Sequence, residues 1–108
     1  MEQNLEIVMS LIMNAGNSKS FSMEAIKAAK ENDFTLAQEK LKEAKNSINA
    51  AHNAQTSLLT KEANGEKTEL SMLLIHGQDH LMNAITFLDI AKEFVELYEK
   101  INGDAKNS

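Results

Sequence analysis

Helix-breaking residues are almost absent from this chain. It contains no proline and only four glycines among 108 residues. Both residue types interrupt helices, because proline lacks a backbone donor and glycine loses much conformational freedom on ordering. Apolar residues recur at helical spacing along most of the sequence. A chain of this length has room for one hydrophobic core, so we expect a single all-α domain over residues 1–108.

Turn signals divide the sequence into three long helices. Asn32-Asp33 and Asn64-Gly65 interrupt the periodic pattern, and Asn102-Gly103 follows its end. The predicted helices span about residues 3–31, 35–63 and 68–101, and residues 103–108 are predicted to form a frayed tail. Long helices joined by short turns predict an antiparallel up-down-up three-helix bundle.

Local signals refine the helix ends. Thr35 and Gln38 have the spacing of a capping box, which predicts that the second helix begins there. Gly65 suits the left-handed residue that closes this helix. Gly16 lies inside the first helix, where glycine costs about 1 kcal/mol against alanine, so we expect a kink or a close helix approach.

The third predicted helix is apolar on two sides. Its inner face comprises Leu70, Leu74, Gly77, Leu81, Ala84, Leu88 and Val95. Its outer face, roughly opposite at 100° per residue, comprises Met72, Ile75, Met82, Ile90, Phe94 and Leu97. Each helix of a three-helix bundle has a side that faces water. The second apolar face therefore predicts self-association.

Asp79 lies in the middle of this outer face. An unpaired charge is costly to bury. Either the carboxylate is exposed, or symmetry-related copies of it converge on a cation. Oxygen ligands of this kind suit Mg²⁺.

Charge and composition exclude several classes of function. The net charge is -5, the chain has no cysteine, and all of its basic residues apart from histidine are lysines. Nucleic acid and anionic lipid surfaces both require a basic patch, and thiol chemistry requires cysteine. Residues 1–16 have neither the basic start nor the continuous apolar run of a signal peptide, so we expect a cytoplasmic protein.

His76, Asp79 and His80 share one face of the third helix. The residues alone leave three readings open. The histidines are zinc ligands with Asp79 as a third ligand, or polar residues with only a structural role, or a nucleophile and a neighbour that orients it. No glycine-rich phosphate loop and no serine elbow is present. His52, in the second helix, is expected to have a structural or surface role.

The segment LLIHGQDHLMNA at residues 73–84 resembles the active-site segment of the lactose/cellobiose family of enzyme IIA proteins, which belong to the bacterial sugar phosphotransferase system. Supporting segments are NAGNSKSFSMEAI at 14–26, the turn at 32–34, AHNAQTSLL at 51–59 and KEANGE at 61–66. The resemblance covers residues 3 to 101.

The resemblance implies a homotrimer of three-helix bundles and a role for each residue of the motif. His76 would carry the phosphoryl group, with Gln78 and His80 supporting it. Asp79 would be shared between three subunits at one structural Mg²⁺ per trimer. Gly77 replaces the alanine that is usual at its position, and from this we expect only some loss of helix propensity.

The same resemblance implies partners. The phosphoryl group would come from the histidine-containing phosphocarrier protein and pass to a cysteine of the cognate enzyme IIB. The membrane would be involved only through the sugar transport component, which takes up a lactose-, cellobiose- or chitobiose-type disaccharide. With no arginine in the chain, lysines, backbone groups or partner side chains must stabilise the phosphoryl group. The alternatives are a metal-binding helical oligomer and a helical adaptor.

Overall fold

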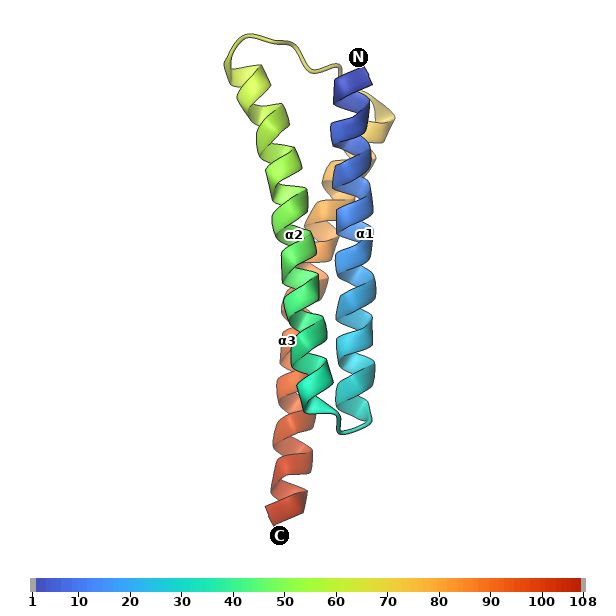
Figure 1. Cartoon of the computed structure of the whole chain (residues 1–108), viewed down its shortest axis with the longest axis vertical. Helices are drawn as coiled ribbons and strands as arrows, with labels where there is room; N and C mark the ends of the chain where they lie inside the picture. Colours follow the sequence, from blue (N-terminus) through green and yellow to red (C-terminus); the bar gives the residue numbers. More distant parts are fainter. Residues whose placement is uncertain (1, 108) are drawn as a thin grey trace.

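The computed structural model describes the backbone of residues 2–107 and the side chains of residues 4–102. Three helices form a rod of 62 × 19 × 18 Å: α1 (Glu2–Lys30), α2 (Phe34–Ala63) and α3 (Met72–Asn107). Helices α1 and α3 run in the same direction and α2 runs opposite to both (Figure 1). The predicted all-α up-down-up bundle is confirmed. Within residues 2–107, no helix is both long and apolar enough to cross a bilayer.

Small residues allow the helices to pack closely. The buried residues of α2 are Ala37, Leu41, Ala44, Ile48, Ala51 and Leu58. They face alanines and leucines of the other helices, including Leu11, Ala15, Leu81 and Ala84. The hydroxyl of Ser18 is fully buried and donates to the carbonyl of Ala44 at 2.9 Å, which ties α1 to α2. These buried positions of α2 recur at helical spacing.

The turn between α1 and α2 differs in detail from the prediction. Asn32 is left-handed with φ 65°, and Asp33 caps α2 by accepting a hydrogen bond from the backbone N–H of Leu36 at 3.1 Å. The predicted capping box of Thr35 and Gln38 is therefore wrong. Asp33 stands two residues earlier and already supplies the side-chain oxygen that the first turn needs.

Helix α3 begins later than predicted. Gly65 has φ 89°, as predicted for the residue after α2, but the chain stays non-helical through Ser71. The side chain of Ser71 accepts a hydrogen bond from the backbone N–H of Leu74 at 3.1 Å. The side-chain cap at Ser71 thus sets the start of α3, although the apolar spacing predicted that the helix begins near residue 68. Leu70, assigned to the inner face, lies before the helix and is exposed.

The end of α3 also differs from the prediction. The helix continues past Asn102-Gly103 to Asn107, so the predicted tail at 103–108 is helical as far as residue 107. A single glycine costs about 1 kcal/mol in a helix and does not by itself end one. The amide of Asn102 donates to the side-chain oxygen of Asn32, which links α3 to the turn between α1 and α2.

Candidate active site

His76 and His80 form a stacked pair on α3. Their ring centroids are 5.4 Å apart and their planes differ by 18°. His76 is exposed, whereas His80 is half-buried. The two residues are one helical turn apart, which brings side chains at i and i+4 together. An exposed imidazole supported by a second ring can accept a group from outside the molecule.

Helix α1 makes room for this pair at Gly16. A Cβ atom built on Gly16 would lie 3.4 Å from Nε2 of His80. The helix passes through this residue without interruption. Of the two outcomes expected for Gly16, the close approach is the one that the structure has. A larger side chain here would push against the imidazole.

The surroundings of His80 disfavour its protonated form. Burial lowers the pKa of His80 below its ordinary value of 6.5, and the positive charges of Lys19 and His76 lower it further, while Asp79 opposes them. These surroundings therefore favour the neutral imidazole of His80. Lys19 was not identifiable as a neighbour from the sequence, because spacing within one helix does not show which residues of another helix it meets.

Gly77 is buried against α1. A Cβ atom at this position would lie 3.1 Å from Cδ2 of Leu11 and 3.4 Å from Cγ1 of Ile12. Leu11 is itself fully buried, so it has little space into which to move. The expectation that Gly77 affects only helix propensity is thus incomplete. The packing of α3 against Leu11 also depends on the absence of a Cβ methyl group at residue 77.

Gln78 does not join the histidine pair within one chain. Its side-chain oxygen accepts a hydrogen bond of 2.6 Å from the amide of Gln55 in α2. Residues two apart on a helix point in nearly opposite directions, so Gln78 lies on the flank of α3 away from His76. Within one chain Gln78 therefore contacts α2 and not the histidine pair, and its supporting role at the phosphoryl site stays a prediction.

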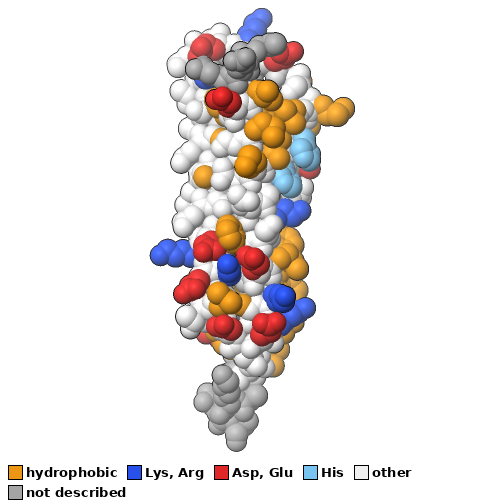
Figure 2. Space-filling view, turned by 45° about the vertical axis from the view of Figure 1, so that its right-hand side comes forward, with side chains coloured by type: hydrophobic (Ala, Val, Ile, Leu, Met, Phe, Trp, Pro, Cys, Tyr) orange, Lys and Arg blue, Asp and Glu red, His pale blue; other side chains and the backbone are white. Residues whose placement is uncertain are grey.

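The outer face of α3 is exposed, as its pattern predicts. Its apolar side chains have exposed fractions between 43% and 86%: Met72, Ile75, Met82, Ile90, Phe94 and Leu97. Asp79 is exposed among them and makes no ion pair within residues 4–102. Figure 2 shows histidine side chains at the edge of a hydrophobic patch on one flank of the rod.

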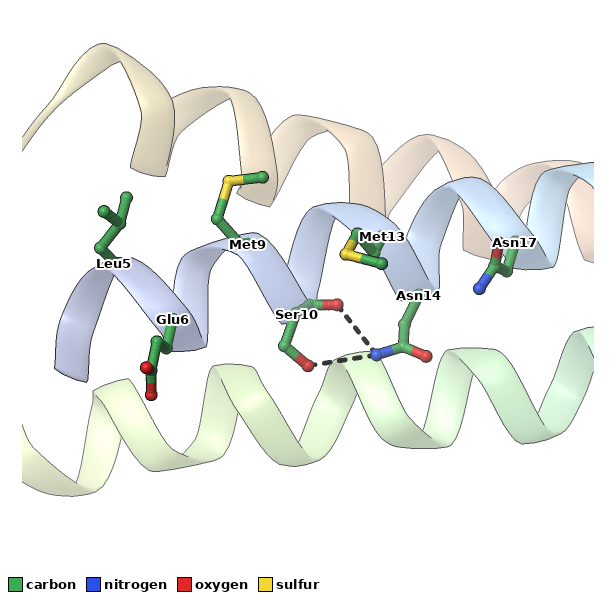
Figure 3. A pocket seen from close by; sticks show the side chains of 7 residues that line it. All are labelled: Leu5, Glu6, Met9, Ser10, Met13, Asn14 and Asn17. Atoms are coloured by element: carbon green, nitrogen blue, oxygen red, sulfur yellow. Dashed lines mark hydrogen bonds between the residues drawn. The ribbon is translucent and has the colours of Figure 1, made fainter. Parts of the chain in front are cut away.

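Helix α1 adds apolar surface of its own. Leu5, Met9 and Met13 are exposed and line a shallow groove with Glu6, Ser10, Asn14 and Asn17. Figure 3 shows these side chains along α1, whose ribbon lies between those of α2 and α3 in this view. The amide of Asn14 donates to the carbonyl and hydroxyl oxygens of Ser10, at 2.9 and 3.2 Å. The uncovered apolar surface is thus not confined to α3.

The part of the chain that the structure describes holds no group of three metal-ligating side chains close enough to bind one ion. His76, Asp79 and His80 therefore do not form a zinc site within one chain. His52 is exposed on α2, in keeping with a surface role.

The fold and the site together define a class of protein: a small helical bundle with an exposed histidine pair beside an uncovered apolar face. Residues 6–99 match the family described as "PTS system, Lactose/Cellobiose specific IIA subunit". The chain is 49% identical to the lichenan-specific phosphotransferase enzyme IIA component of Bacillus subtilis, over 93% of this chain and 91% of that protein.

Solved structures agree with this match. The cellobiose-specific enzyme IIA of Bacillus anthracis has a TM-score of 0.91 and 50% identity, over 95% of this chain and 94% of that one. The chitobiose enzyme IIA of Escherichia coli, in complex with HPr, has a TM-score of 0.80 and 35% identity, over 92% and 96%. The chain therefore belongs to the lactose/cellobiose family of phosphotransferase-system enzymes IIA, and it is a phosphoryl carrier that acts as a relay.

Proposed function

We propose that His76 is the residue that carries the phosphoryl group. It accepts the group from the histidine-containing phosphocarrier protein HPr and donates it to a cysteine of the cognate enzyme IIB. The observation that carries this proposal is the exposed His76 ring stacked on His80, 5.4 Å away. The E. coli relative that forms a complex with HPr supports the identity of the donor.

The chemistry needs few groups. An unprotonated imidazole nitrogen is a competent nucleophile near neutral pH. Phosphoryl transfer depends mainly on position and on stabilisation of charge, so no pair of acid and base carboxylates is required. His80 orients the ring of His76 by stacking on it. Gln78 supports the site indirectly, because its bond to Gln55 holds α3 against α2.

Assembly as a homotrimer through the outer face of α3 is part of the same proposal. The face presents six exposed apolar side chains to solvent in a single chain, and α1 adds Leu5, Met9 and Met13. Burying such a surface in an assembly removes it from water, which is favourable by roughly 25 cal/mol of free energy per Å² of apolar area. Three copies arranged about one axis would each turn this face toward that axis, where neighbouring copies cover it.

Asp79 fits a shared ion better than an ion bound by one chain. One exposed carboxylate supplies too few oxygens for Mg²⁺, which prefers six ligands. Three copies around a symmetry axis would supply several carboxylate oxygens, and water molecules would supply the remaining ligands of the ion. The ion would neutralise three carboxylates that otherwise repel one another, and its role would be structural.

The sugar is a disaccharide of the lactose, cellobiose or chitobiose type. Lichenan, cellobiose and chitobiose appear in the names of the similar proteins above. A relay that exchanges only the phosphoryl group need not contact the sugar. We propose that it works in the cytoplasm, where its phosphoryl donor is made, and meets the membrane only through the transport component.

Phosphorylation from phosphoenolpyruvate tests the proposal. The protein is incubated with phosphoenolpyruvate, the general phosphotransferase enzyme and HPr, and base-stable, acid-labile phosphate is measured. His76→Ala should abolish labelling, whereas His80→Ala should be labelled. His52→Ala is a matched control, because His52 is an exposed histidine on α2. Labelling that survives in His76→Ala would contradict the assignment.

A further inference from the structure

The phosphoryl site needs a positive charge that α3 does not supply. A phosphoryl group carries roughly -1.5 to -2 charges at neutral pH. The chain has no arginine. On α3, the first lysine after His76 is Lys92, about 24 Å further along the axis at 1.5 Å per residue. Asp79, beside the histidines, carries a negative charge and cannot stabilise a phosphoryl group. The cation must come from another helix or from a partner.

Helix α1 places one lysine beside the histidine pair. Gly16 faces the ring of His80, and Lys19 is three residues further along α1, on the same side of the helix. Lys19 is the only basic residue of α1 before Lys27. The residues one turn to either side on this flank, Ile12 and Met23, are apolar. A single cation thus interrupts an apolar flank at the level of the histidines.

The direction of the side chains favours contact with a group on His76. α1 and α3 run in the same direction, and side chains on a helix lean toward its N-terminus. Lys19 and His80 therefore both lean toward the level of His76. Lys19 is half-buried, so its stem packs on the bundle while the ammonium group can reach solvent.

The charge of Lys19 is available to a ligand. Within residues 4–102 it forms no ion pair; the salt bridges there join Lys40 to Glu24 and Glu43. Its field already acts on the neighbouring ring, since it contributes to the lowered pKa of His80. A free ammonium group next to an exposed nucleophile is well placed to bind phosphoryl oxygens.

We infer that Lys19 binds the phosphoryl group as it moves on to and off His76, supplying the charge for which many phosphate sites use arginine. The inference rests on the proposed function of His76. A lone pair of His76 forms the new N–P bond while the bond between phosphorus and the donor's histidine nitrogen breaks, and that electron pair returns to the donor ring. Lys19 keeps its proton throughout, and nothing is oxidised or reduced.

Single-turnover transfer from phosphorylated HPr tests this role. Lys19→Gln and Lys19→Met remove the charge, Lys19→Arg keeps it, and Lys27→Gln removes an exposed lysine from the same helix as a matched control. The rate at saturating donor should fall about tenfold or more in the two neutral variants, the loss expected for one charge-assisted hydrogen bond. Lys19→Arg should stay within about threefold of the wild type, and Lys27→Gln should be unchanged.

Several results would overturn the inference. One is a wild-type rate in both neutral variants. Another is a defect only in the donor concentration that gives half-maximal rate, which would place Lys19 in a docking surface. A third is an equal loss in Lys27→Gln, which would indicate a general effect of surface charge. Circular dichroism verifies that the variants are folded. If the wild type itself takes no label on His76, the proposed function fails, a result distinct from a normal rate in the variants.

Discussion

The two apolar faces of α3 are built from similar residues but lie in different surroundings. On the inner face Leu81, Leu88 and Val95 are at most 3% exposed. On the outer face Met82 and Leu97 are 67% and 50% exposed. Helices α1 and α2 of the same chain cover these three inner side chains. Within residues 4–102, no helix of the same chain covers the outer face. The histidine pair lies between the two, where a partner would find it.

Truncating a buried side chain of the inner face should have the largest effect on stability. Leu81→Ala removes a fully buried side chain and should lower the free energy of unfolding by about 2–5 kcal/mol. Met82→Ala is the matched control, since it is the next residue but faces outward. In denaturant titrations Leu81→Ala should unfold earlier at every protein concentration. The account of the two faces is wrong if, at a protein concentration low enough to dissociate the assembly, Met82→Ala lowers the free energy of unfolding as much as Leu81→Ala does.

A charge in the outer face should prevent assembly without unfolding the chain. Ile90→Lys places an ammonium group at a position that is 48% exposed in the single chain. In the proposed trimer this position is buried. Three such charges around one axis repel each other and lose hydration. Light scattering should show a smaller particle with the helical content of the wild type. An unchanged particle mass would argue against this face as the contact.

The charge of Asp79 should have a smaller and conditional effect. Asp79→Asn removes the repulsion between copies together with the ligand for the ion. The wild-type assembly should weaken when a chelator is added and recover with Mg²⁺. The variant should respond to neither. Equal sensitivity to chelator in both proteins would show that any stabilising ion binds elsewhere.

Much of this arrangement is readable from the sequence, for physical reasons. Core positions of α2 and both faces of α3 follow from helical periodicity, which depends only on spacing. The helix ends are less predictable, since Asp33 and Ser71 compete with Thr35 and the apolar spacing near residue 68. Contacts between helices are not predictable from spacing at all. The nearness of Gly16 and Lys19 to His80, and of Gln55 to Gln78, depends on how the helices pack.

The smallest expected effect concerns the titration of His80. Its pKa should lie below 6.5 in the folded protein, because burial and then the charges of Lys19 and His76 disfavour protonation. The unfolded chain then binds the proton more readily. His80 therefore contributes its full stability above pH 6.5, and this is lost as pH falls through the lowered folded pKa. An NMR titration measures the value directly, and Lys19→Gln should raise it. A pKa at or above 6.5 would contradict these surroundings.

Sedimentation equilibrium of the unmodified protein at micromolar concentration, with Mg²⁺ present, tests most directly whether the outer face of α3 is an assembly face with the phosphoryl site at its edge. The account predicts a particle of three times the 12.0 kDa chain mass. A stable monomer of 12.0 kDa under these conditions would contradict it.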